Sequence, residues 1–265
     1  MCLIALAWNT RPDLPLALIA NRDESHARPT ASAGVDPNAS DVYGGRDLEK
    51  GGSWLQIASR RRLAAVTNVR TGAMDTAARS RGWLVRDFVR SRVTAQAFAT
   101  ALQDDAADYG RFNLLLWDGD ALWFASNAPV AVAYPVAPGL HAMSNGAFDA
   151  PWPKANAATR TLQAWLDSAS SAHATPAPTA RLAPLFDGLR DTRSAPDVDL
   201  PDTGVGLALE RRLSPPFIED AAYGTRCSSI VLAHVDTLLF AERRFGADGL
   251  VTGESTATFP TRHAA

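Results

Sequence analysis

Short apolar runs of strand length recur along the chain and limit what it can fold into. The first two, LIALAW (3–8) and LALIA (16–20), are joined by a turn at residues 11–13. Each run is too short for an ordinary helix and is apolar at consecutive positions, which is typical of strands buried on both faces. The sequence therefore predicts two neighbouring buried strands at its start.

Further runs repeat this pattern in hairpins and alternate with helical segments. Strands are expected at 53–59, 63–69, 112–117, 121–127, 130–134, 140–144, 228–235, 237–243 and near 256–259. Helical spacing of apolar residues is found at 82–92, 94–109, 154–168 and 180–189, with Thr94 as a candidate N-cap. Strand pairs joined by tight turns, with the helices segregated, predict the α+β class: two sheets face to face with helices outside.

We interpret residues 1–265 as a single domain. Loose loops are expected near 25–50, 169–180 and 191–204, where proline and small or polar residues accumulate. The glycine-rich stretch 44–52 lacks the Lys-Ser/Thr ending of a phosphate-binding loop, so we expect a flexible flap there.

Composition excludes several classes of protein. A net charge of −2 gives no reason to expect nucleic-acid binding, and no apolar stretch approaches the ~20 residues that span a bilayer. The start does not resemble a secretory signal, and two cysteines suit a reducing compartment, so we expect a cytoplasmic protein. None of the five histidines has the spacing of a zinc site, so no metal is expected.

Cys2 has two interpretations. In one it is a small apolar residue at the start of a buried strand. In the other, removal of Met1 leaves Cys2 as the mature N-terminus. Its α-amine, with a pKa of about 8, is then a base for its own thiol, with a pKa of about 8.5.

Asn21, Arg22, Asp23 and Glu24 follow the second apolar run directly. They form either a polar turn with a local ion pair, which contributes little when exposed, or part of a site. If the first two strands are antiparallel, the start of one lies beside the end of the other, and Cys2 meets Arg22. The guanidinium would then favour the thiolate.

These features together resemble a known family, the NRDE family, also named the transport and Golgi organisation protein family. The resemblance is carried by Met1-Cys2, the NRDE block (21–24) with Arg28-Pro29, GGSWLQIA (51–58), LAAVTN (63–68), SNGAFDAPWPK (144–154) and YGTRCSSIVL (223–232). It covers nearly the whole chain in order. It implies the N-terminal-nucleophile hydrolase fold, a four-layer α-β-β-α sandwich.

The more distant kin implied by this resemblance are bile-salt hydrolases and penicillin V acylases, which cleave amides with an N-terminal cysteine. The positions that match their sites are Cys2, Arg22, Asp23, Asn68, Asn145 and Arg226. In those hydrolases two residues separate the arginine from the acid, whereas here they are adjacent, so either Asp23 or Glu24 could be the acid.

Two functions are compatible with these residues. In the first, Cys2 attacks the carbonyl of an amide or thioester, Arg22 and Asp23 order the nucleophile, and Asn68 and Asn145 bind the oxyanion. No cofactor is then required. In the second, the same pocket carries haem or an acyl lipid without chemistry, in line with links of the family to haem movement and lipid metabolism.

Three residues of this set also have plain structural interpretations. Asn68 and Asn145 end apolar runs, where asparagine often caps a strand or forms a turn. Arg226, whose donors suit a carboxylate or carbonyl group, is equally a surface arginine at a strand start.

Overall fold

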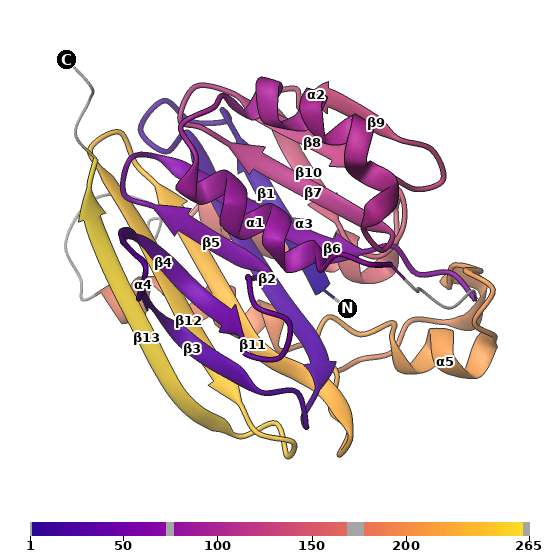
Figure 1. Ribbon diagram of the computed structural model, residues 1–265. Helices are drawn as coiled ribbons and strands as arrows, with labels where there is room; N and C mark the ends of the chain where they lie inside the picture. The colour runs from indigo at the N-terminus through magenta and orange to yellow at the C-terminus, as the bar shows by residue number, and fades with distance from the viewer. Residues whose placement is uncertain (1, 73–76, 169–177, 262–265) are drawn as a thin grey trace.

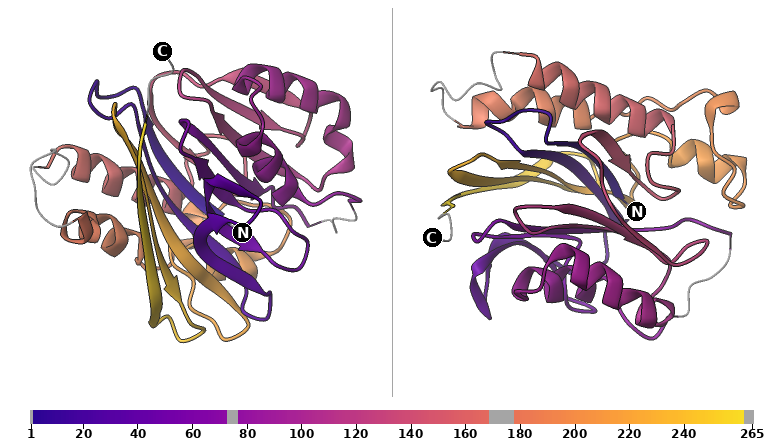
Figure 2. Two further views of the ribbon diagram at one scale, coloured as in Figure 1. Left: turned by 60° about the vertical axis from the view of Figure 1, so that its left-hand side comes forward. Right: turned by 90° about the horizontal axis from the view of Figure 1, so that it is seen from above.

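The computed structural model describes residues 2–72, 77–168 and 178–261 of the 265-residue chain. Within these residues, two antiparallel sheets lie face to face, and helices cover the outer face of each (Figures 1 and 2). The view from above in Figure 2 separates the four layers in the order helix, sheet, sheet, helix. The predicted α+β class and α-β-β-α sandwich are confirmed.

The first sheet contains both of the first two predicted strands. In the described residues it has the order β10-β1-β2-β11-β12-β13. These strands are β1 (Cys2–Trp8), β2 (Leu16–Ser25), β10 (Gly139–Met143), β11 (Tyr223–Ala233), β12 (Thr237–Phe245) and β13 (Val251–Pro260). Both neighbours of β2 are antiparallel to it, as expected for β1.

The second sheet follows the chain without a crossover, in the order β3 to β9. Its strands are β3 (Thr30–Asp36), β4 (Ala39–Asp47), β5 (Leu55–Ala58), β6 (Arg62–Asn68), β7 (Phe112–Trp117), β8 (Leu122–Ser126) and β9 (Val132–Pro135). The predicted β5–β6 and β7–β8 hairpins are both present.

Two pairs of helices cover the sheets. On the second sheet lie α1 (Arg81–Arg90) and α2 (Ala95–Asp105); on the first lie α3 (Pro153–Leu166) and α4 (Pro178–Leu189). Shorter helical segments are Ala106–Asp108, Asp197–Asp199 and α5 (Leu207–Arg212). Thr94 caps α2 as predicted, since its hydroxyl accepts a hydrogen bond of 3.1 Å from the Ala97 amide.

Strand alternation divides the core of the first sheet between its two faces. On β1, Ile4 and Leu6 pack between the sheets, whereas Leu3 and Ala5 pack against the helix layer of α3 and α4. All four side chains are fully buried. This burial on both faces explains why the strand is apolar at consecutive positions.

The structure contains two strands in a segment that was expected to be a loose loop. Residues 25–50, expected as a loose loop, contain β3 and β4, and the first two glycines of the expected flap belong to β4. β3 consists mostly of small, partly buried or exposed residues, and the buried centre of β4 (42–45) is only four residues long and includes two glycines, so neither strand has an apolar run. Residues 191–204 contain only a short 3₁₀ segment within an otherwise irregular path. Most of the expected loop at 169–180 lies outside the described residues.

The structure also differs from the expectation at the NRDE block (21–24), which does not form a turn. β2 continues through it to Ser25. The polar side chains find partners inside the fold: the Asn21 amide donates to the Leu189 and Pro216 carbonyls, both at 2.8 Å, and its oxygen accepts from the Ser228 hydroxyl at 2.6 Å. Because these hydrogen bonds compensate for burial, a strand that is polar in sequence remains inside the protein.

We expect Ile4→Ala to lower the free energy of unfolding by about 2–5 kcal/mol, because it removes a fully buried side chain between the sheets. Urea denaturation measures the change. Val251→Ala on the edge strand β13, where the side chain is 46% exposed, is the control and should cost at most about 1 kcal/mol. Similar losses in both variants would contradict the assigned core.

Candidate active site

The register of three neighbouring strands sets the geometry of the site. Cys2 on β1 pairs with Arg22 on β2, and Arg22 pairs with Cys227 on β11. The predicted meeting of Cys2 and Arg22 is confirmed. By strand alternation, Cys2 and Arg22 share the face between the sheets, whereas Asp23 lies on the helix face with Asn21.

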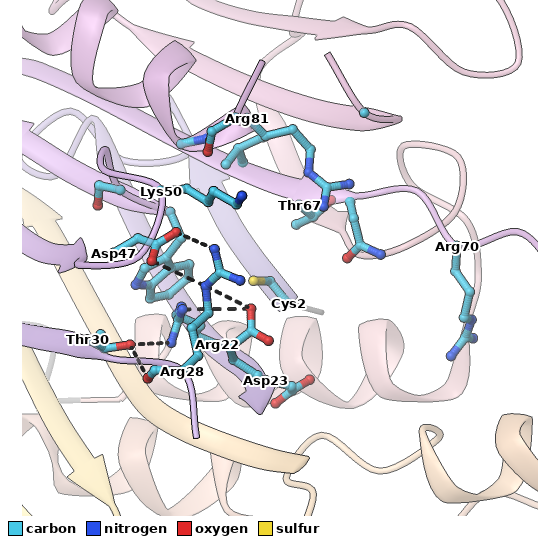
Figure 3. Close-up of a pocket in the computed structure, with 18 of the residues that line it drawn as sticks. Cys2, Arg22, Asp23, Arg28, Thr30, Asp47, Lys50, Thr67, Arg70 and Arg81 are labelled. Atoms are coloured by element: carbon cyan, nitrogen blue, oxygen red, sulfur yellow. Dashed lines mark hydrogen bonds and ion pairs between the residues drawn. The ribbon is translucent and has the colours of Figure 1, made fainter. Parts of the chain in front are cut away.

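A cavity of about 710 Å³ opens at this end of the first sheet. Its wall includes Cys2, Arg22, Asp23 and Asn68, four of the six residues that the resemblance indicates. Figure 3 shows the Cys2 sulfur and the head groups of Arg22 and Arg28 in the same region of the cavity. The cavity is thus large enough for a small molecule to approach the thiol.

Positive charge predominates on the cavity wall. Among the described residues that line it, seven are basic and three are acidic, whereas the whole chain carries −2. The basic residues are Arg22, Arg28, Arg46, Lys50, Arg70, Arg79 and Arg81; the acidic ones are Asp23, Glu24 and Asp47. Arg70 and Arg79 pair with Glu210, Asp105 and Asp108, which lie outside this set, and the positive charge that remains favours anions.

Arg22 is held in place from two sides. One guanidinium nitrogen donates to the Thr30 hydroxyl at 3.3 Å, and another lies 3.8 Å from the Glu24 carboxylate. Arg28 beside it makes a two-point contact with Asp47, with its shorter distance at 2.7 Å (Figure 3). These contacts order the guanidinium groups next to Cys2.

The Cys2 thiol is in a mixed electrostatic environment. Its residue is 7% exposed, and this burial raises the pKa of the thiol. The Asp23 carboxylate raises it further, whereas the Arg22 guanidinium lowers it. Burial has the largest effect, so the pKa of the thiol stays above its usual value despite the neighbouring guanidinium.

The two candidate acids occupy opposite faces of β2. Asp23 is buried and accepts a hydrogen bond of 2.7 Å from the Thr225 hydroxyl. Burial raises the pKa of Asp23, while the Lys154 ammonium lowers it. Glu24 is partly exposed and lies within 4 Å of the guanidinium groups of Arg22 and Arg28. Asp23 is therefore a buried carboxylate held by Thr225, whereas Glu24 lies beside the two arginines.

The two asparagines are in contact, but only one lines the cavity. The Asn145 side-chain nitrogen donates to the Asn68 carbonyl at 3.0 Å and to its side-chain oxygen at 2.9 Å. Both protons of that nitrogen are thereby committed, and Asn145 is fully buried. Of the two asparagines, Asn68 lines the cavity. The hydrogen bonds from Asn145 fix the orientation of the Asn68 side chain.

Arg226 has a different position from the other candidates. It sits at an irregularity between Thr225 and Cys227 on β11. Its guanidinium donates to the carbonyls of Ser25 at 2.7 Å and Arg28 at 3.2 Å. In the described part of the chain it lines a smaller cavity of about 90 Å³ and not the one that contains Cys2. These contacts hold the turn between β2 and β3.

Reasoning from sequence missed three residues that contact or perturb Asp23. They are Thr225, Tyr223, whose hydroxyl donates to the Asp23 carbonyl at 3.0 Å, and the buried Lys154. All three belong to blocks that carry the family resemblance, YGTRCSSIVL and SNGAFDAPWPK. Their position in these family blocks was the signal that the sequence offered, because neither block contains a motif of known chemistry.

The described residues contain no cluster of three or more His, Cys, Asp or Glu side chains arranged to bind a metal ion. In the same residues no helix is long and apolar enough to cross a membrane.

Comparison with known proteins gives matches along nearly the whole chain. The family model described as Transport and Golgi organisation 2 matches residues 1–247. The human Transport and Golgi organization protein 2 homolog is 30% identical over 263 residues, which cover 92% of each chain. Transport and Golgi organization protein 2 of Drosophila melanogaster is 30% identical over 258 residues, covering 88% of this chain and 87% of that protein.

One similar solved structure is the C2A mutant of the conjugated bile acid hydrolase from Clostridium perfringens. It aligns with a TM-score of 0.50 at 8% identity and covers 99% of this chain and 100% of that chain. The alignment supports the N-terminal-nucleophile hydrolase fold that the sequence predicts.

We expect a limiting amount of iodoacetamide at pH 7 to label Cys2 before Cys227. Burial and the Glu242 carboxylate raise the pKa of the Cys227 thiol well above its usual value, and Cys2 lines the larger cavity. Peptide mapping measures the two modifications. Cys2→Ser is the control and should leave the labelling rate of Cys227 unchanged. Faster labelling of Cys227 in the wild type would refute the assignment of Cys2 as the more reactive thiol.

Proposed function

Because the chain belongs to the Transport and Golgi organisation 2 family and has an N-terminal-nucleophile hydrolase fold, we propose that it hydrolyses an amide or thioester bond of an acyl compound. The nucleophile in this proposal is Cys2. The observation that supports it best is the register that sets Cys2 beside Arg22 at the wall of a cavity of about 710 Å³.

The reaction begins with the amine of mature Cys2, which is free once Met1 is removed. This amine accepts the thiol proton, and the thiolate attacks the substrate carbonyl carbon. The Asn68 amide donates to the oxyanion of the tetrahedral intermediate. As the intermediate collapses, the protonated amine gives its proton to the leaving nitrogen or sulfur, and an acyl thioester on Cys2 remains. Water, deprotonated by the same amine, then releases the acid and regenerates the thiol.

Asp23 is suited to orient the base. In the antiparallel register, Cys2 pairs with Arg22, so the amino end of Cys2 points toward Asp23 along β2. A carboxylate there can accept a hydrogen bond from the amine and fix its direction. Asp23 is itself fixed by the Thr225 hydroxyl at 2.7 Å.

The charge on the cavity wall favours an anionic substrate. Seven basic residues face three acidic ones among the described lining residues, and the exposed Lys50 makes no ion pair within 4.0 Å in the described chain. Apolar residues of the same wall, Val66, Leu209 and Leu213, offer a surface for an acyl chain. We therefore propose an acyl compound that carries a carboxylate or phosphate group.

A second candidate function is a carrier that binds such an anion without hydrolysing it. The raised pKa of the Cys2 thiol favours this alternative if Met1 is retained, because the chain then has no amine base at Cys2. Haem is one possible cargo: its propionates would suit the arginines, and the Cys2 thiolate could ligate its iron.

Cys2→Ala separates the two functions. For a hydrolase, we expect turnover to fall by about 10³-fold or more while substrate binding is retained, because the variant loses the nucleophile but little contact area. Hydrolysis of a panel of acyl amides and thioesters, with calorimetry for binding, gives both quantities. Cys227→Ser is the matched control and should keep full turnover. A wild-type protein that binds panel compounds or haem tightly but hydrolyses none of them would replace the hydrolase with the carrier.

Lys50→Gln tests the preference for anions. We expect kcat/KM for an acyl substrate with a carboxylate to fall by about fivefold, the effect of an exposed charge pair, and to change little for its uncharged amide analogue. Added salt should reduce the difference, because it screens exposed charges. The control is Arg160→Gln, which removes one exposed positive charge from α3 outside the cavity wall. Equal effects of the two variants would count against anion recognition by this wall.

A further inference from the structure

A short segment far along the chain contributes an apolar side to the cavity. The α5 segment, residues 203–213, contains α5 and the residues that flank it, and α5 lies beyond the ends of both sheets (Figures 1 and 2). Val205, Leu209 and Leu213 of this segment line the cavity. They are spaced by four residues, so Leu209 and Leu213 lie on one face of the helix. Leu209 is 39% exposed, and its apolar surface is therefore open to a ligand.

Glu210 ties the α5 segment to the body of the protein. One of its carboxylate oxygens lies 2.7 Å from the guanidinium of Arg70, two residues after β6. The other oxygen accepts hydrogen bonds from the Thr203 amide at 3.0 Å and the Thr203 hydroxyl at 2.6 Å. Both charges are buried. A buried ion pair adds little net stability compared with apolar packing, but its directed contacts fix the geometry of the segments that it joins.

Two further contacts hold the α5 segment near its two ends. A Cβ atom on Gly72 would lie 2.5 Å from the Gly204 carbonyl oxygen, so the two backbones approach closely. The buried ammonium of Lys154 donates a hydrogen bond of 3.2 Å to the Leu213 carbonyl. The segment is thus held at its start, middle and end, and its apolar side chains have fixed places on the cavity wall.

The α5 segment and the basic residues that attract anions lie on different sides of the thiol. Figure 3 shows Arg28 and Lys50 to the left of Cys2 and Arg70 to the right. Because Glu210 contacts Arg70, the α5 segment belongs to the Arg70 side, where the ion pair compensates the charge of the guanidinium. On the other side, the exposed Lys50 makes no ion pair within 4.0 Å in the described chain.

We propose that the α5 segment is the wall that binds the apolar chain of the substrate, and that Glu210 is the positioning residue that holds this wall in place. This inference rests on the proposed function, because it assigns places to the two ends of an anionic acyl compound. The anion lies on the Lys50 side of Cys2, and the apolar chain lies on the α5 side. Chains long enough to contact Leu209 are then preferred over short ones.

Calorimetry with straight-chain carboxylates, from butanoate to decanoate, tests the wall without requiring turnover. We expect the wild-type affinity to rise about threefold with each methylene that contacts the α5 segment, because apolar surface leaves water. Leu209→Ser should lower the affinity for decanoate by about fivefold, through loss of that apolar contact, and leave the affinity for butanoate nearly unchanged.

Leu207→Ser is the matched control. It is the same substitution on the same helix, at a side chain that is 48% exposed and is not among the described residues that line the cavity. It should leave the affinities of the whole series unchanged. Equal effects of the two serine variants, or a wild-type affinity that does not depend on chain length, would overturn the assignment of the wall.

The role of Glu210 is tested by combining variants. Glu210→Ala should remove most of the dependence on chain length and keep the affinity for butanoate. Leu209→Ser should then cause little further loss in the Glu210→Ala protein, because the wall is no longer in place. Additive losses for decanoate would refute the positioning role. If Glu210→Ala does not fold, Glu210→Gln, which keeps an oxygen for Thr203 but loses the charge that faces Arg70, is used with the same expectation.

Hydrolysis separates this inference from the proposed function. If the wild type hydrolyses none of the corresponding acyl thioesters but binds the carboxylates with a chain-length dependence that requires Leu209, the proposed hydrolysis fails and the wall stands. If it hydrolyses short and long acyl thioesters equally well, and Leu209→Ser changes neither rate, the wall is rejected and the proposed function stands.

Discussion

The antiparallel pairing of β1 with β2 is the constraint on which the rest of the site depends. It sets Cys2 opposite Arg22, and strand alternation then assigns the polar residues of β2 to two faces. Arg22 lies between the sheets with the thiol, while Asp23 lies on the helix face of β2, where it accepts a hydrogen bond from the Thr225 hydroxyl. A slip of one residue would exchange these faces and separate the guanidinium from the thiol. Apolar residues on both faces of β1 and β2 hold the register in place.

The two faces of β2 thus present different side chains to the site. Between the sheets, the basic wall around Arg22 and Arg28 is open to small anions. On the helix face of β2, Asp23 accepts a hydrogen bond of 2.7 Å from the Thr225 hydroxyl, and Arg70, which lines the same cavity, forms a buried ion pair of 2.7 Å with Glu210. Cys2 lies at the start of β1, where it lines the cavity and its amino end points toward Asp23.

The elements with long apolar runs were predicted correctly from the sequence. The prediction failed for strand segments whose buried residues are polar. β1, the first half of β2 and the β7–β8 hairpin follow directly from their apolar residues. The second half of β2 was expected as a turn because its burial depends on distant partners, such as the Leu189 carbonyl that accepts from Asn21. β3 was missed because its residues are mostly small and partly exposed, and β4 was missed because its buried centre is only four residues long and includes two glycines.

The same limit applies to the site residues. The pairing of Cys2 with Arg22 was predictable from two adjacent strands. Two other arrangements could not be predicted, because they depend on hydrogen bonds between segments far apart in the chain. Asn145 orients Asn68, and Arg226 holds the turn between β2 and β3. Lys154 gave no signal of its own, because a lysine in the first turn of a helix is ordinarily exposed.

The most direct test of the central claim is mass spectrometry of the protein, acid-quenched shortly after mixing with an acyl thioester. If Cys2 is the nucleophile and carries its own base, the N-terminal peptide begins at Cys2, and part of it gains the mass of one acyl group. Cys2→Ala shows no such gain. An N-terminal peptide that still begins at Met1, with no acyl group on Cys2 at any quench time, would contradict the account.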